Sequence, residues 1–371
     1  MKKILIALAA VAALAACSKS EVAYEQPGEI GIAPFAQNRT KAMVSGTEFP
    51  NEQFNVWAYY KQIDVNSSIT EWQNSGLEQT TYINERPFAQ RGETKLWGGV
   101  TSYFWPKLGS LMFVGYYPTT MAEKVDYNFS DSENKMTVTG YSPTTDKYGE
   151  TGFVATDAKE CEEDFMYFNM TANSCSSTTE GPENSVKGGY HVDVVFKHAL
   201  SWLTVYVDRD DVNTPDNAKI RVTNISFTNI TTTGDGVVDN SNPDATIKWS
   251  PNKGTADADG NFPNVTDVNI LGANEKYLGE GEEPYTCLQP IVIPQEMEGD
   301  LVITYQIISE DDSYFEETKT ISLAELHAIA GGDATFEAAK KYTYNILIGT
   351  SEILIDPNVA EWAETSSEFK Y

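Results

Sequence analysis

The sequence is poor in positive charge, with 26 Lys and Arg residues against 54 Asp and Glu residues and a formal net charge of −28. Proteins that bind nucleic acids contact the phosphates through clustered Lys and Arg side chains. The acidic residues here are spread along the chain, which favours a solvated, self-repelling surface over a dedicated cation site. The composition therefore argues against nucleic acid as a partner.

Histidine is also scarce, with 3 residues. His191 and His198 differ by seven positions, so a regular strand would place them on opposite faces. His198 follows Phe196 and precedes Leu200, and we expect it to be a packed core residue. His327 has no partner nearby in the sequence. The sequence contains no H-E-x-x-H, G-x-S-x-G, Walker-type or G-x-G-x-x-G motif. We expect a protein that is not an enzyme, with no catalytic residue, metal or cofactor.

Long apolar runs are missing except at the start of the chain, where Lys2 and Lys3 precede an uncharged run over residues 4–16. This run is shorter than the roughly 20 residues that a membrane-spanning helix needs, and it has the length of a secretory signal peptide. Its end, Leu-Ala-Ala-Cys17, resembles the bacterial lipobox, in which the cysteine becomes the lipidated first residue. We predict a signal peptide over 1–16, lipidation at Cys17 and a spacer over 17–28. The alternative is an ordinary signal peptide with an accidental cysteine.

Three further cysteines remain, Cys161, Cys175 and Cys287, and an odd number cannot form a complete disulfide framework. Cys161 and Cys175 could close a loop, or all three could be unreactive thiols. The spacing fits no metal site.

Short runs rich in aromatic and β-branched residues, separated by Gly, Asn, Asp and Pro, predict an all-β protein and favour sandwiches. The clearest runs are 54–60, 110–117, 192–196, 203–207, 219–227, 301–308 and 342–348. A short connecting helix is predicted after Ser322, because Ser322 and Glu325 form a capping box. Residues 234–274 are rich in Asp, Asn, Gly and Pro, and we expect an extended loop system there.

The length of 371 residues suggests two domains, which we place at 29–190 and 191–371. The polar stretch 171–189 reads as a surface loop or linker. Apolar residues at 192, 194, 196 and 200 share one parity, whereas those at 203, 205 and 207 have the other. A regular strand allows no such slip, so a bulge or bend is predicted near Ser201-Trp202.

Several motifs taken together resemble the fimbrillin family of Bacteroidales, the subunits of type V pili. The resemblance covers nearly the whole chain. It rests on the lipobox, the I-x-I-x-P-F strand at 30–35, the basic stretch 38–42, and the segments 54–60, 103–106, 111–118, 196–202, 291–295, 341–348 and 359–362.

The resemblance implies two tandem transthyretin-like β-sandwiches with a few short helices, in a lipoprotein matured by a trypsin-like protease. Residues 29–41 would hold a removable first strand (Ile30, Ile32, Phe35) and its processing site (Arg39, Lys41). The family's favoured T-R-A context is replaced here by Thr40-Lys41-Ala42, which leaves the cleaved bond open. The alternative is a permanent first strand with a basic surface turn.

A strand from another subunit would then fill the groove, as in the family. The candidate donor residues lie near the C-terminus: Ile353, Ile355, Val359 and Trp362. Pro357 is expected to interrupt this segment, and the tail to Tyr371 is an alternative donor.

The expected function is that of a structural subunit of cell-surface fimbriae, anchored by lipid in the outer membrane until it is processed, and serving adhesion. Its expected partners are other fimbrial subunits, the trypsin-like protease, and a host or bacterial surface ligand. The alternative is a monomeric surface lipoprotein that binds glycans through exposed aromatic side chains, although core packing is the default for its tryptophans.

Overall fold

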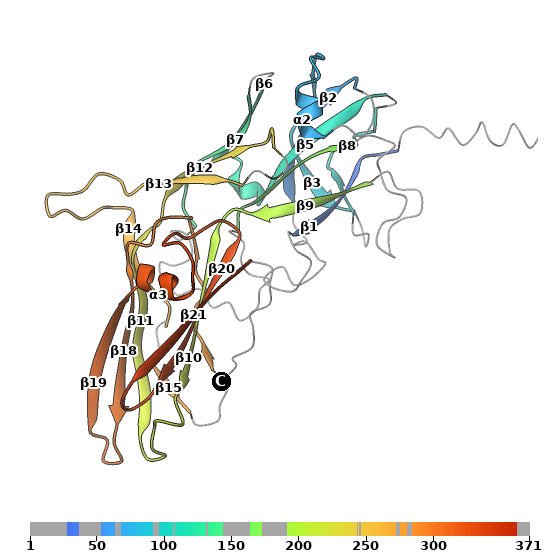
Figure 1. Cartoon of the computed structure of the whole chain (residues 1–371). Coiled ribbons are helices and arrows are strands. Elements are labelled where there is room, and N and C mark those ends of the chain that lie inside the picture. The colour runs from blue at the N-terminus through green and yellow to red at the C-terminus, as the bar shows by residue number, and fades with distance from the viewer. Residues whose placement is uncertain are drawn as a thin grey trace, which may run out of the picture.

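The computed structural model describes residues 28–36, 53–63, 68–91, 96–106, 108–130, 133–143, 164–172, 191–242, 244, 246–271, 275–279 and 284–361. Strands dominate these residues, which confirms the expected all-β class (Figure 1). No helix among them is long and apolar enough to cross a membrane.

The N-terminal part contains a closed barrel. Its strand order is β1 (Gly31–Ala36), β4 (Trp97–Gly99), β3 (Thr80–Gln90), β2 (Phe54–Lys61), β5 (Ser110–Tyr117), β8 (Met166–Ala172) and β9 (His191–His198). All neighbours are antiparallel except β1 and β9, which run parallel. A closed barrel has no sheet edge, so this arrangement differs from the sandwich that we expected here.

A four-stranded sheet covers the outer face of β2 and β5. Its order is β13 (Lys248–Pro251), β12 (Gly234–Asp239), β7 (Glu133–Tyr141) and β6 (Val125–Ser130). Successive residues of β2 point to opposite sides. Val56 packs in the barrel interior, and Trp57 packs in the layer between the barrel and this sheet. Because both faces are covered, β2 and β5 are mostly apolar instead of alternating between apolar and polar residues, and β5 coincides with the predicted run 110–117.

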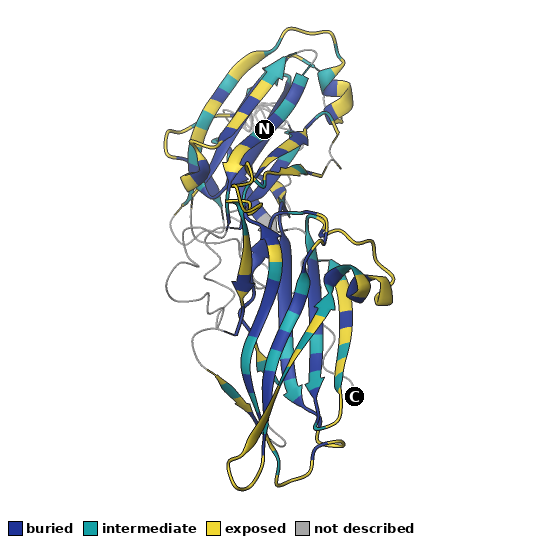
Figure 2. Ribbon diagram, turned by 90° about the vertical axis from the view of Figure 1, so that its left-hand side faces the viewer, coloured by how far each residue is buried: buried dark blue, intermediate teal, exposed yellow. Residues whose placement is uncertain are grey.

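The C-terminal part is a two-layer sandwich around one core. One sheet contains β10 (Ser201–Arg209), β16 (Tyr285–Thr286), β17 (Ile291–Val292), β20 (Lys340–Ile348) and β21 (Ile353–Glu361). The facing sheet contains β14 (Val265–Asn269), β11 (Lys219–Thr231), β15 (Lys276–Leu278), β18 (Asp300–Ile308) and β19 (Tyr314–Ser322). Figure 2 shows the buried residues along the strands of both parts and the exposed ones mainly on loops and outer strands.

The two parts do not divide where the sequence suggested. Strand β9 was expected to open the second domain, but it lies in the barrel between β1 and β8. The chain changes sheets at Ala199–Leu200, between β9 and β10, and this break explains the slip in parity. Strand β12 then returns to pair with β7, and β13 pairs with β12, so the N-terminal part is assembled from two separate stretches.

The expected loop system over 234–274 was wrong, because it contains β12, β13 and β14. Buried and exposed residues alternate in β12, and its buried positions include the small residues Gly234 and Gly236. Glycine has no apolar side chain, so these two buried positions do not show as part of an apolar pattern. The strand was therefore not recognised in the sequence.

Two α-helices and one 3-10 turn complete the described elements: α2 (Ile69–Gln73), α3 (Leu323–Ile329) and η1 (Thr119–Met121). Helix α3 is the predicted one, and the Ser322 hydroxyl accepts a hydrogen bond from the Glu325 amide. Helix α2 was missed, although Ser68 and Glu71 form a complete capping box there.

Candidate functional site at strand β1

Strand β1 is the piece that closes the barrel. It pairs in parallel with β9 over six positions, from Gly31 opposite His191 to Ala36 opposite Phe196. On its other side it pairs with β4 at Gly31 and Ile32. Figure 1 shows β1 beside β9. Both edges of the expected first strand are therefore bonded within the chain.

The segment just before β1 is also held. The Ile30 amide donates to the Tyr103 carbonyl at 2.7 Å, and the Trp105 amide donates to the Gly28 carbonyl at 3.1 Å. Residues 103–105 thus pair with the segment before β1 on the same edge that β4 occupies further along, and Glu29 lies opposite Phe104 in an antiparallel bridge.

The inward side chains of β1 fill the barrel. Ile30 is 1% exposed and Ile32 is 0% exposed, and both belong to a core cluster that includes Phe54 and Trp105. Burial of a side chain of this size stabilises by about 1.5–3 kcal/mol. Phe35 pairs with Val195 through its backbone; its side chain lies outside the described part of the chain. The removable-strand residues that can be described thus fill an apolar slot.

An ion pair holds the start of this segment. The Arg91 guanidinium donates to both carboxylate oxygens of Glu29 and to the Gly99 carbonyl, the last at 3.1 Å. The hydrogen bonds from Arg91 lower the pKa of Glu29 below its ordinary value. A Cβ atom at Gly98 would collide with the Arg91 side chain, so glycine makes room for it. The pair is partly exposed and its contribution to stability is small.

Several predicted site residues lie outside the described residues: Cys17, Arg39, Lys41, Trp362 and the possible disulfide partners Cys161 and Cys175. Cys287 is described; it is a buried free thiol, and burial raises its pKa well above the usual range.

The candidate donor segment forms β21, the outermost strand of its sheet. It pairs with β20 over nine positions, from Ile353 opposite Ile348 to Glu361 opposite Lys340. Ile353 and Ile355 pack partly against the sandwich core, whereas Val359 is 36% exposed. Pro357 does not interrupt the strand, contrary to expectation. An edge strand tolerates proline because one side needs no amide donor.

Strands β1 and β21 share a sequence pattern. β1 and its preceding residue read Ile30-Gly-Ile32-Ala-Pro34, and β21 reads Ile353-Leu-Ile355-Asp-Pro357. In both, the two isoleucines lie on the face that packs on a core. Comparing the two ends of the chain could have revealed this.

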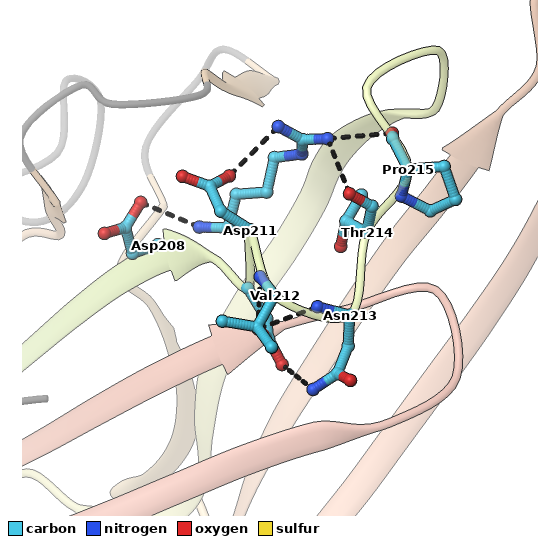
Figure 3. Close-up of polar contacts among 8 residues, drawn as sticks. Asp208, Asp211, Val212, Asn213, Thr214 and Pro215 are labelled. Atoms are coloured by element: carbon cyan, nitrogen blue, oxygen red, sulfur yellow. Dashed lines mark hydrogen bonds and ion pairs between the residues drawn. The ribbon is translucent and has the colours of Figure 1, made fainter.

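A cluster of polar contacts lies elsewhere, on the loop after β10 (Figure 3). The buried Arg209 side chain binds Asp211 at 3.0 Å and the carbonyls of Thr214 and Pro215 at 3.2 and 2.9 Å. Asp210 accepts hydrogen bonds from the backbone amides of Val212 and Asn213. These hydrogen bonds and this ion pair lie within the loop, so they hold its conformation.

The side chains of two histidines, His198 and His327, have polar partners. His198 is buried as expected, and its Nδ1 lies 2.6 Å from Asp164 Oδ2. His327 Nδ1 lies 3.1 Å from the Asp333 carbonyl oxygen. Within the described ranges, no group of His, Cys, Asp and Glu side chains could hold a metal ion.

The fold and this site define a two-part all-β protein whose first strand completes a barrel formed by later strands. A family model described as fimbrillin-like matches residues 51–362. The chain belongs to the fimbrillin-like family. This membership associates the chain with cell-surface fimbriae and other fimbrial subunits, and with a structural role.

One solved structure shares the fold, and a second is reported with it as a similar protein. A fimbrial protein from Bacteroides vulgatus is 16% identical with a TM-score of 0.54, and the match covers 90% of this chain and 99% of that one. The tip fimbrial protein Mfa3 from Porphyromonas gingivalis is 12% identical with a TM-score of 0.38, covering 90% and 100%. No curated protein matches the sequence.

Proposed function

We propose that this protein is a fimbrial subunit exported as a lipoprotein on Cys17 and assembled by strand exchange. A trypsin-like protease cuts after Arg39 or Lys41, β1 leaves the barrel, and a strand from another subunit takes its place. The observation that carries this proposal is that, among the described strands, only β1 joins β4 to β9, and that basic residues follow it closely in the sequence. An anchoring subunit would instead keep Cys17 and β1.

The energetics favour refilling of the slot. Loss of β1 would unpair the facing edges of β9 and β4 and expose the apolar positions now covered by Ile30 and Ile32. An open sheet edge next to an apolar slot readily accepts another strand. Main-chain hydrogen bonds give such an added strand its affinity, and alternate side chains give it specificity.

We infer that β21 is the donor. Its Ile353, Ile355 and Pro357 have the spacing and chain direction of Ile30, Ile32 and Pro34. It leaves its own sheet at a modest cost, because it is an edge strand with isoleucines that are only partly buried. In the slot, the same isoleucines would be enclosed as those of β1 are now.

A disulfide lock tests the release of β1. Ala33 and Asp193 are partners in register on neighbouring strands. Adjacent strands lie about 4.8 Å apart, within the range that a disulfide spans. The test protein starts at residue 17 and carries Ala33→Cys and Asp193→Cys, with Cys17, Cys161 and Cys175 replaced by Ser; its matched control has only the three Ser replacements.

Mild trypsin treatment should give the control a new N-terminus at Thr40 or Ala42 and a ladder of polymers on gently heated gels. The locked protein should be cut at the same bond yet stay monomeric until a reductant is added. Polymers formed by the oxidised locked protein would refute the release of β1, and a cut control that stays monomeric would refute assembly by strand exchange.

Two neighbouring substitutions test the donor. Ile355→Asp should abolish the ladder, because it would put a charge into the apolar slot. Leu354→Asp is the control, since Leu354 is 47% exposed on the opposite face of β21. Trypsin should cut both variants. Equal ladders from the two would exclude β21 as the donor in this register.

A further inference from the structure

A cleft of about 1000 Å³ lies away from the β1 slot, where the two parts of the molecule meet. Its walls come from the end of β9, from β13 and the residues around it, and from the stretches 294–298 and 335–340. Ligand sites often occupy clefts of this size between domains.

One wall carries an aromatic side chain that is fixed in place. The Trp249 indole N–H donates to the Ala199 carbonyl at 2.7 Å, and its ring packs on Tyr141 with the centroids 5.6 Å apart. Trp249 is only partly buried and lines the cleft. Close by, the Tyr167 hydroxyl accepts a hydrogen bond from the Ile247 amide at 2.8 Å. Both rings are therefore oriented before any ligand arrives.

The charges of the lining mix both signs. Lys253 pairs with Glu298, and Lys340 pairs with Glu361. Further carboxylates, such as that of the exposed Glu296, disfavour an anion, while the lysines disfavour a cation. A ligand whose groups both donate and accept hydrogen bonds suits such a lining, and hydroxyl groups do this.

We propose that this cleft binds a neutral oligosaccharide, with one sugar ring stacked on Trp249 and its hydroxyls bonded to the charged rim. The amphipathic ring of tryptophan suits a ligand with one apolar face and a polar edge. Strand β1 does not contribute to the cleft, whereas β21 contributes Glu361 at its rim, so the site is complete in the uncut protein, in which β21 lies in its own sheet.

The test uses the uncut full-length protein and four probes: maltohexaose, laminarihexaose, cellohexaose and mannohexaose. Titration calorimetry should show that at least one binds, with a Kd below about 1 mM. Trp249→Leu and Glu296→Arg should each weaken that binding at least about tenfold. Phe315→Ala is the control, because Phe315 is an exposed aromatic residue on β19, outside the cleft.

Trp249→Leu could disturb packing, so far-ultraviolet circular dichroism must match that of the parent protein. Glu296→Arg changes an exposed side chain and keeps the test decisive if Trp249→Leu does not fold. The proposal is overturned if no hexasaccharide binds, if Glu296→Arg leaves binding unchanged, or if Phe315→Ala weakens it equally. Since the protein is uncut, failure here leaves the strand-exchange proposal unaffected.

Discussion

Replacement of Ile32 by Ala is a direct measure of how firmly β1 is seated. The Ile32 side chain is 0% exposed in the barrel core, so its truncation removes buried methyl groups and leaves a cavity. Such substitutions cost about 2–5 kcal/mol. We expect the free energy of opening of the barrel to fall by about 3 kcal/mol, within that range.

Hydrogen exchange with mass spectrometry can measure this locally, on peptides that cover β2 and β5 in the uncut protein. Both strands belong to the barrel, and β2 contributes Phe54 and Val56 to the same core as Ile32. Val195→Ala is the matched control, because Val195 lies on the neighbouring β9 and is 52% exposed. Its effect should stay within about 0.5 kcal/mol.

The reasoning would be refuted by a change below about 1 kcal/mol for Ile32→Ala, or by equal changes in the two variants.

A second comparison concerns the cut protein. Once trypsin has released β1, Ile32→Ala and the parent should show the same exchange, because the altered residue is gone. A difference that persists would mean that β1 stays in the barrel after cleavage.

Three further predictions concern stability. Ala339 has a φ of 60°, a conformation in which its Cβ is strained, so Ala339→Gly should raise the free energy of unfolding in urea by up to about 1 kcal/mol; a loss would contradict the strain. The buried Lys61 ammonium donates to the carbonyls of Trp72 and Gln73 at 3.1 and 3.0 Å, so Lys61→Met should cost about 1–3 kcal/mol in the same assay, and an unchanged stability would show that these bonds contribute little. Burial lowers the pKa of Lys341 from 10.5 to about 8. Between these values the unfolded chain binds the extra proton, so the stability of the parent should rise from pH 8 to 9.5 by up to about 2 kcal/mol relative to Lys341→Met; parallel pH profiles would contradict a depressed pKa.

The strands that could be predicted are those with a strong local signal. The runs 54–60 and 110–117 are apolar except for Asn55 and Ser110, because both faces are buried, and both runs lie in strands. Strand β12 gave no such signal, since two of its buried positions are the glycines Gly234 and Gly236. Closure of the barrel was equally hidden, because the parallel pairing of residues 31–36 with 191–196 depends on everything folded between them.

The candidate site shows the same division. The I-x-I-x-P pattern and its inward isoleucines could be read from the sequence, and Ile30 and Ile32 are buried as a first strand requires. The pairing of β1 with both β4 and β9 could not be predicted from the sequence, since neither register is encoded locally. The ion pair between Arg91 and Glu29 was missed for the same reason, because the two residues lie 62 positions apart and only the fold brings them together.

On the proposed mechanism, cleavage controls assembly because β1 and β21 compete for one slot under unequal conditions. While the chain is intact, β1 is tethered beside its slot, and its effective concentration exceeds that of any β21 from another molecule. Strand β1 is also hydrogen-bonded to described strands on both edges, whereas β21 is paired with one described strand, β20. A β21 strand that moves into the slot would therefore gain backbone hydrogen bonds on a second edge. After cleavage the tether is lost, and a released β1 dilutes into the solvent while the concentration of β21 is unchanged. The intact protein should therefore stay monomeric in a concentrated solution, as sedimentation can show, and polymers without cleavage would mean that the barrel does not restrain assembly.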